Sequence, residues 1–232
     1  MAELKTLIFD WDGTLCDSVG RIVEAMTEAA KSTGLVIPSE QAVRDIIGLG
    51  LPEAIATLFP DMDEPWLAEK LRQHYSDHYV ALEARPAELF PGVAEGLERF
   101  RSAGYKMAVA TGKSRRGLDR ILAAHGLTGF FDMTRCADET LSKPHPRMLE
   151  EILNRLETPA SCAVMLGDSE FDLRMAHGAR VRAVAATYGA QSRAHLLQSN
   201  PEHCIDAFID FPGWVMPASD AAGQQRIDNV IG

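Results

Sequence analysis

Two aspartates directly follow a short apolar run near the N-terminus of the chain. Residues 7–9 are Leu-Ile-Phe, and Asp10, Asp12 and Gly13 come next. The apolar run predicts a buried strand, and the glycine indicates a turn at its end. The two-residue spacing places both carboxylates on one side of an extended chain, where they repel unless a cation or a shared proton lies between them. This pattern is typical of metal-assisted phosphoryl transfer, although a bare Asp-x-Asp is also common in plain acidic turns.

Three further segments carry polar residues that could join this pair. Thr111-Gly112 and Asp168 each follow an apolar run, and Lys143 lies in a loop between two such runs. Asp172 comes four residues after Asp168, about one helical turn away. Ligands of open parallel sheets bind outside the carboxyl ends of the strands. If the strands are parallel neighbours, a hydroxyl, an ammonium group and four carboxylates therefore converge.

In this order and spacing, the segments resemble the four motifs of the haloacid dehalogenase superfamily of aspartyl-phosphate enzymes. The matching stretches are Asp-x-Asp-Gly-Thr-Leu from Asp10, Thr111-Gly112, Lys143, and Gly-Asp-Ser around Asp168 with Asp172. The resemblance covers essentially the whole chain. It implies an α/β fold, with a Rossmann-like parallel sheet core, helices on both faces, and a small all-helical cap domain inserted after the first strand.

The resemblance also implies a role for each motif residue. Asp10 is the nucleophile that becomes phosphorylated, and Asp12 protonates the leaving alcohol and then activates water. Thr111 and the backbone N–H of Gly112 bind phosphoryl oxygens at a helix start, with a simple N-cap as the alternative for Thr111. Lys143 balances the crowded negative charge and contacts the phosphoryl group.

Mg²⁺ is the cofactor that the resemblance implies. Its ligands would be the side chains of Asp10 and Asp168 together with the backbone carbonyl of Asp12, because oxygen donors suit this hard ion. Asp172 would bind the ion through water or orient its ligands. The alternative for Asp172 is a carboxylate favoured only by its place near a helix N-terminus.

The hydrophobic pattern divides the chain into a helical segment and an alternating α/β segment. Between residues 17 and 83 the period is helical, with no convincing strand, and Ser39 is expected to cap a helix over 40–47. Further helices are expected over 52–58 and 64–82. From about residue 90, predicted strands (106–110, 131–135, 162–166, 183–186, 204–208) alternate with predicted helices (92–102, 114–125, 146–156, 171–179, 192–199).

This alternation predicts βαβ units and a parallel sheet. We therefore expect a core domain from residues 1–15 and 86–232 and a cap domain from residues 16–85. Residues 218–232 are expected to form a mobile tail. Asp17 or Ser18 is expected to be the N-cap of the first helix of the cap.

Gly48-Leu49-Gly50 interrupts the helical pattern of the expected cap. It resembles the cap of phosphoglycolate phosphatases, and its glycines would let the backbone approach a small anionic substrate. A plain turn between helices explains the sequence equally well. Arg44 is the nearest cation that could meet a substrate carboxylate, but a solvated helix arginine is the favoured interpretation.

Composition limits the class of partner. The formal charge of −10 argues against nucleic acid, and no apolar run approaches a membrane span. Lys113, Arg115 and Arg116 form the only tight basic cluster, which we expect to be a solvated helix start. Four scattered cysteines and an N-terminus without a signal peptide predict reduced thiols and a cytoplasmic location. We expect a monomer or a homodimer.

The sequence thus predicts a Mg²⁺-dependent phosphomonoester hydrolase acting on a small phosphorylated metabolite, with phosphoglycolate as the named candidate. Asp12 favours O–P cleavage, because relatives that cleave carbon–halogen bonds lack an aspartate there. The alternatives are a phosphomutase of the β-phosphoglucomutase type and a pyrophosphatase or nucleotidase of the same superfamily. A non-catalytic binding protein is disfavoured, since Asp10, Asp12 and Asp168 are all present.

Overall fold

A six-stranded parallel sheet forms the centre of the molecule in the computed structural model, which describes residues 3–216. Its strands lie in the order β3-β2-β1-β4-β5-β6. Phe9, the last residue of β1, pairs with Val109 on β2 and Leu166 on β4, so these three strands end at the same edge. The bounds are β1 Thr6–Phe9, β2 Lys106–Thr111, β3 Met133–Cys136, β4 Ala163–Gly167, β5 Arg182–Ala186 and β6 His203–Ile205.

Helices cover both faces of the sheet, as expected for buried parallel strands. Leu7 and Phe9 pack on the face covered by α5 (Val93–Ser102), α6 (Arg115–Ala124) and α10 (Phe211–Val215). Ile8 points to the opposite face, which is covered by α7 (Arg147–Arg155), α8 (Glu170–Gly178) and α9 (Arg193–Leu196). Because side chains alternate along β1, they contribute to two separate apolar cores, one on each face of the sheet. The predicted α/β fold class is confirmed.

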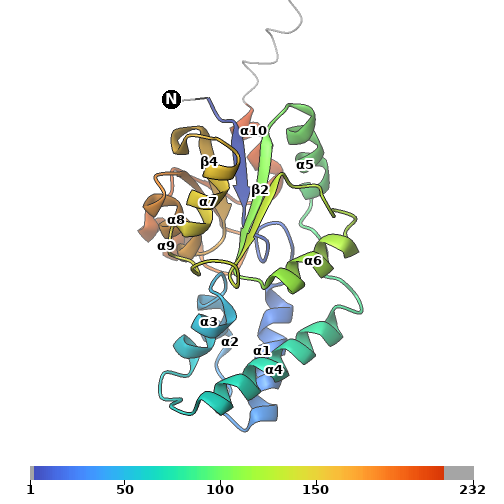
Figure 1. Cartoon of the computed structure of the whole chain (residues 1–232), viewed down its shortest axis with the longest axis vertical. Helices are drawn as coiled ribbons and strands as arrows, with labels where there is room; N and C mark the ends of the chain where they lie inside the picture. Colours follow the sequence, from blue (N-terminus) through green and yellow to red (C-terminus); the bar gives the residue numbers. More distant parts are fainter. Residues whose placement is uncertain (1–2, 217–232) are drawn as a thin grey trace, which may run out of the picture.

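Four helices follow β1 directly, and we call them the cap segment. They are α1 Val19–Thr33, α2 Glu40–Asp45, α3 Leu51–Leu58 and α4 Pro65–Leu82. They build apolar clusters of their own and lie below the carboxyl end of the sheet (Figure 1). The two connections between the sheet and the cap segment lie side by side. Cys16 forms a β-bridge with Leu89, and the Asp17 N–H donates to the Glu88 carbonyl. The exact domain boundaries stay a prediction.

Most expected elements exist, with shifted ends. Gly34 ends α1 in the left-handed conformation, and Ser39 caps α2, which stops at Asp45 rather than residue 47. The helix expected over 192–199 is split into α9 and a 3₁₀ turn. The expected mobile tail, 218–232, lies outside the described residues.

The last expected strand is wrong beyond Ile205, because Phe208 begins a 3₁₀ turn that leads into the unanticipated α10. Phe208 and Phe211 both pack near Phe9, with ring centroids 6.3 and 6.0 Å from it, so tertiary packing overrides local β propensity here. All four cysteines are free thiols. No helix in the described part of the chain is long and apolar enough to cross a membrane.

Candidate active site

Three buried carboxylates meet at the carboxyl edge of the sheet. Asp10 follows β1, Asp168 follows β4, and Asp172 lies in the first turn of α8. One oxygen from each of the three lies within 4.8 Å of the others. The Asp10 N–H donates to the Leu166 carbonyl at 2.9 Å, which extends the strand pairing into the site. The register of β1 against β4 therefore brings these carboxylates together.

Lys143 joins two of these carboxylates from the loop before α7. Its Nζ donates to Asp10 Oδ1 at 2.7 Å and to Asp172 Oδ1 at 2.6 Å, and its side chain is fully buried. Burial alone would lower the pKa of Lys143, but the attraction of the two carboxylates outweighs it and raises the pKa above its ordinary value. Lys143 is therefore a fixed positive charge inside the site.

Asp10 keeps one oxygen without a hydrogen-bond partner. Burial, the largest influence, raises the pKa of Asp10 to about 7, although Lys143 pulls it downward. Its Oδ2 is buried and accepts no hydrogen bond from residues 3–216. An unpartnered buried carboxylate oxygen costs stability unless a ligand or an ion completes it. That oxygen is therefore available for bonding to a ligand.

Asp168 is held from both sides by short loops. The Thr14 hydroxyl donates to its Oδ1 at 3.0 Å, and the Ala190 N–H donates to its Oδ2 at 2.6 Å. A Cβ at Gly13 or Gly189 would lie 2.1 or 2.3 Å from that Oδ2, so neither position tolerates a side chain. Gly13 also has φ +77°, which only glycine adopts readily. Burial, then repulsion from neighbouring carboxylates, raises the pKa of Asp168.

Asp172 lies at the start of α8, which is one of the two alternatives for it, and its role toward a metal ion stays a prediction. Its Oδ2 accepts from the Ser169 N–H at 3.1 Å and from the Ser169 hydroxyl at 2.7 Å, which forms a capping box at the start of α8. Its other oxygen accepts from Lys143. Asp172 is thus a helix cap that also fixes the ammonium group of Lys143.

The donor set fits a hard divalent cation. The cluster of Asp10, Asp168 and Asp172 offers only carboxylate oxygens, which Mg²⁺ prefers. The Asp12 carboxylate is not a member of this cluster. The predicted ligation of the ion by the Asp12 backbone carbonyl stays a prediction.

Asp12 is fixed by two residues whose importance the sequence did not reveal. The Ser18 hydroxyl donates to Asp12 Oδ1 at 2.5 Å, and the Lys113 ammonium lies 3.0 Å from the same oxygen. Ser18 occupies the N-cap position of α1 as predicted, but its side chain makes no capping bond. Only the tertiary structure could identify Ser18, because six residues separate it from Asp12.

The expected solvated location of Lys113 is wrong. Its side chain is only 10% exposed, and its Nζ also donates to the Tyr79 hydroxyl on α4 at 2.9 Å and lies 4.5 Å from the centre of that ring. Lys113 therefore links the cap segment to Asp12. The position of Lys113 directly after Thr111-Gly112 was the sequence signal that could have placed it in the site.

Thr111 and Gly112 lie where β2 ends, with Thr111 fully buried. Ser114 is the N-cap of α6, so the alternative role of Thr111 as that cap is wrong. The Thr111 hydroxyl instead accepts from the Lys113 N–H at 3.2 Å. A Cβ at Gly112 would lie 2.4 Å from the Leu49 carbonyl oxygen, so the backbone of the cap segment rests directly on this glycine.

The loop of Gly48, Leu49 and Gly50 lies against the motif loops at the sheet edge, and its role in substrate specificity stays a prediction. Gly48 has φ +106°, and the Gly50 N–H donates to the Ser142 hydroxyl at 2.8 Å, next to Lys143. Arg44 instead pairs with Glu40 on its own helix, which agrees with the favoured interpretation of that arginine.

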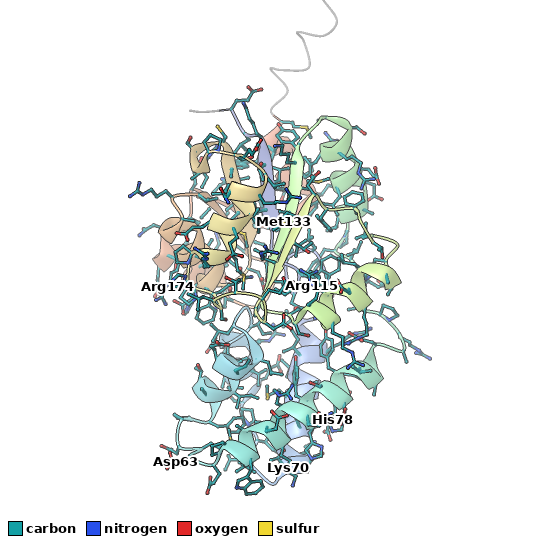
Figure 2. The ribbon with its side chains drawn as sticks, in the orientation of Figure 1. Asp63, Lys70, His78, Arg115, Met133 and Arg174 are labelled. Carbon is teal, nitrogen blue, oxygen red and sulfur yellow. The ribbon has the colours of Figure 1, made fainter. Side chains whose placement is uncertain are left out.

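A cavity of about 470 Å³ lies between the sheet edge and the cap segment. Asp10 and Asp12 line its inner end, Gly112 and Lys113 one side, and residues of α1, α3 and α4 the opposite side. In Figure 2, Arg115 marks the start of α6 on the sheet side of this junction, and His78 marks α4 on the other side. A molecule that reaches Asp10 through this cavity must therefore fit under the cap segment.

Comparison with known proteins agrees with this geometry. The family model described as haloacid dehalogenase-like hydrolase matches residues 7–186. The chain is 34% identical to the probable phosphatase IndB of Dickeya dadantii (strain 3937), over 89% of this chain and 91% of that protein. It is 32% identical to a phosphoglycolate phosphatase of Vibrio parahaemolyticus, over 90% of this chain and 94% of that protein.

Among solved structures, a predicted phosphoglycolate phosphatase from Haemophilus somnus 129PT superimposes with a TM-score of 0.82 at 26% identity. That match covers 93% of this chain and 100% of the other. The family match spans most of the chain and includes all four motifs. The chain therefore belongs to the haloacid dehalogenase-like hydrolase family, within which it is a phosphatase.

Proposed function

We propose that the protein hydrolyses phosphate monoesters of small metabolites through an aspartyl-phosphate on Asp10, with Mg²⁺ as its cofactor. The observation that carries the proposal is the state of Asp10, a cavity-lining carboxylate with one oxygen bound to Lys143 and the other unpartnered. A carboxylate nucleophile divides one difficult displacement into two easier steps. In the first step, Asp10 Oδ2 bonds to phosphorus as the bond to the ester oxygen breaks.

Asp12 is the proposed acid and base. It lines the same cavity, and Ser18 and Lys113 both contact its Oδ1, which leaves Oδ2 to face the leaving oxygen. Asp12 gives a proton to the departing alkoxide and then takes one from the water that attacks the phosphoryl group. This second step releases inorganic phosphate and restores the Asp10 carboxylate.

Thr111, the Gly112 N–H and Lys143 are the proposed donors to the phosphoryl oxygens. Lys143 also orients Asp10 through the 2.7 Å hydrogen bond and partly offsets the rise in its pKa that burial causes. Asp10, Asp168 and Asp172 would hold Mg²⁺ directly or through water, and the bound ion supplies positive charge to the phosphoryl oxygens. Closure of the cap segment over these groups excludes water other than the attacking molecule.

Phosphate release measured with and without a chelator tests this proposal. We expect the protein to release inorganic phosphate in steady state from a panel of phosphate monoesters, and to lose this activity in excess chelator until Mg²⁺ is restored. Asp10→Asn should lower the activity at least about 10³-fold. Asp63→Asn, at an exposed loop position, is the matched control and should remain active.

Two results would contradict the proposal in different ways. Full activity in excess chelator would refute the metal. Unchanged turnover in Asp10→Asn would refute the nucleophile. Conversion of a sugar phosphate without release of phosphate would instead identify a phosphomutase.

A further inference from the structure

The cavity offers more room than a two-carbon ester fills. Its volume of about 470 Å³ corresponds to about 16 water-sized groups, at about 30 Å³ each. Aliphatic side chains of the cap segment form much of the lining, among them Ile22, Met26, Ile47 and Leu51. Such a wall gives a small carboxylate ester no favourable contact, but it stabilises an apolar group taken out of water.

Two stacked tyrosines of α4 form another part of the wall. The ring centroids of Tyr75 and Tyr79 lie 5.8 Å apart at 29°. Tyr79 is held by Lys113, whereas the Tyr75 hydroxyl makes no hydrogen bond with another described residue. Burial raises the pKa of Tyr75, so its hydroxyl stays neutral. Tyr75 therefore presents an uncharged aromatic surface and one spare hydroxyl.

The positive charges around the cavity are mostly engaged. Lys113 pairs with Asp12, and the other two paired cations are Arg72 with Glu69 and Arg120 with Glu83. Arg116, in the first turn of α6, makes no ion pair within residues 3–216, but it is exposed at the rim. A substrate carboxylate next to the phosphoryl group would therefore meet no spare cation among the described residues of the inner cavity.

We propose that the preferred substrate is a phosphate monoester whose alcohol part carries an uncharged flat ring. The phosphoryl group would bind at Asp10, and the ring would lie against Tyr75 and the aliphatic wall of the cap segment. Offset or edge-to-face packing on Tyr75 adds to the gain from burial, and its hydroxyl can serve one polar substituent. This inference rests on the proposed phosphatase function and adds the chemical class of the substrate to it.

Three esters of primary alcohols separate the substrate classes: 2-phenylethyl phosphate carries a ring, phosphoglycolate carries a carboxylate, and ethyl phosphate carries neither. We expect kcat/KM for the ring ester to exceed that for ethyl phosphate at least about tenfold, equivalent to about 1.4 kcal/mol. Phosphoglycolate should gain nothing over ethyl phosphate. A kcat/KM for phosphoglycolate above that for the ring ester would overturn the inference, as would equal values for all three.

Substitutions of residues that line the cavity test which side chains cause the preference for the ring ester. Tyr75→Leu should lower the ratio of kcat/KM between ring ester and ethyl phosphate about three- to tenfold, mainly through KM. Val80→Asp should lower it too, and because Val80 is 46% exposed this change does not threaten folding. Phe59→Leu removes a ring from the apolar packing of the same segment away from the cavity, and it should leave the ratio unchanged.

Arg116→Gln tests the competing class of substrate. The inference predicts that this change leaves the order of the three esters as it was. It is overturned if Arg116→Gln selectively lowers kcat/KM for phosphoglycolate while Tyr75→Leu and Val80→Asp leave the ring preference intact. Failure of the protein to release phosphate from any ester would instead refute the proposed function itself, so the two failures are distinguishable.

Discussion

At the scale of single residues, the site holds three carboxylates close together with one buried ammonium group. Lys143 contacts Asp10 and Asp172, while Asp168 relies on the Thr14 hydroxyl and the Ala190 N–H. Burial raises the pKa values of Asp10 and Asp168, which means that the folded chain resists ionising them. The proposed Mg²⁺ would relieve that cost by balancing the charge of the ionised carboxylates.

Loss of Lys143 should expose this imbalance. Lys143→Met leaves two buried carboxylates without their cation, and removing one partner of a buried pair typically costs about 3–5 kcal/mol. We expect a loss of that size in the free energy of unfolding, measured with urea in metal-free buffer. Lys31→Met is the control, because its pair with Glu28 is about half exposed and should contribute little. Equal losses in the two variants would show that the Lys143 pair is not a structural requirement.

The role of Asp12 should depend on the leaving group. Asp12→Asn removes the proton that an alkoxide needs, so kcat for an alkyl phosphate should fall about 10²–10⁴-fold. Nitrophenolate leaves without a proton, so the first turnover of 4-nitrophenyl phosphate should persist as a burst followed by slow hydrolysis. Stopped-flow absorbance distinguishes the two phases. A burst that slows as much as alkyl ester turnover would contradict the assignment of Asp12 as the acid.

At the scale of elements, the site depends on how the cap segment meets the sheet edge. The Leu49 carbonyl rests against Gly112, the Gly50 N–H bonds to Ser142, and Lys113 bonds to Tyr79. Each contact joins the cap segment to a loop that carries a motif residue. A movement of the cap segment should therefore also move the loops that carry the motif residues.

A methyl group at Gly112 should displace the loop of residues 48–50. In Gly112→Ala, the new Cβ would lie 2.4 Å from the Leu49 oxygen, a distance that forces the loop to move. We expect faster hydrogen exchange at the Gly50 amide, measured by NMR, because its bond to Ser142 loosens. Gly20→Ala, where a Cβ meets nothing within 4 Å, is the control and should leave that rate unchanged. Unchanged exchange in Gly112→Ala would mean that the loop is not held by this contact.

The sequence predicted the sheet core well, because the strands depend on local signals. Apolar runs predicted β1, β2 and β4, and the polar residues at their ends identified Asp10, Thr111 and Asp168. Ser18 and Lys113 escaped that reasoning, since their contacts with Asp12 depend on tertiary packing. The turn at Phe208 was missed for the same reason, because aromatic packing fixes it. Local sequence patterns indicate candidate site residues, whereas tertiary packing determines which side chains are in contact.

At the scale of the whole molecule, the ionisation of Asp10 couples stability to pH. Its pKa in the folded chain is about 7, well above the ordinary value of 3.8, so between these values the folded state holds a proton that the unfolded state has lost. The stability from neutral Asp10 is therefore present below about pH 4 and is lost as pH rises toward 7. Mg²⁺, which binds ionised carboxylates, should stabilise most at the upper end of this range.

Urea unfolding of wild type and Asp10→Asn at pH 5 and pH 7.5 measures this coupling. In chelator, the unfolding free energy of wild type should fall relative to that of Asp10→Asn as pH rises. Only wild type has an Asp10 carboxyl that must ionise in the buried site, because Asn cannot ionise. Saturating Mg²⁺ should reverse that shift. Subtracting the variant removes the contribution of titrating groups that lie away from Asp10. A difference that stays constant with pH, with and without Mg²⁺, would show that the folded state does not perturb Asp10.

The central claim is that a phosphoryl group passes through Asp10, and direct detection of that adduct tests it most directly. Asp12→Asn mixed with 4-nitrophenyl phosphate and Mg²⁺ should accumulate the intermediate, which acid quenching, proteolysis and mass spectrometry can locate. We predict a phosphorylated peptide that contains Asp10 and that disappears when Asp10→Asn is added to the same chain. A phosphoryl group on any other residue, or a nitrophenolate burst without a modified peptide, would contradict the account.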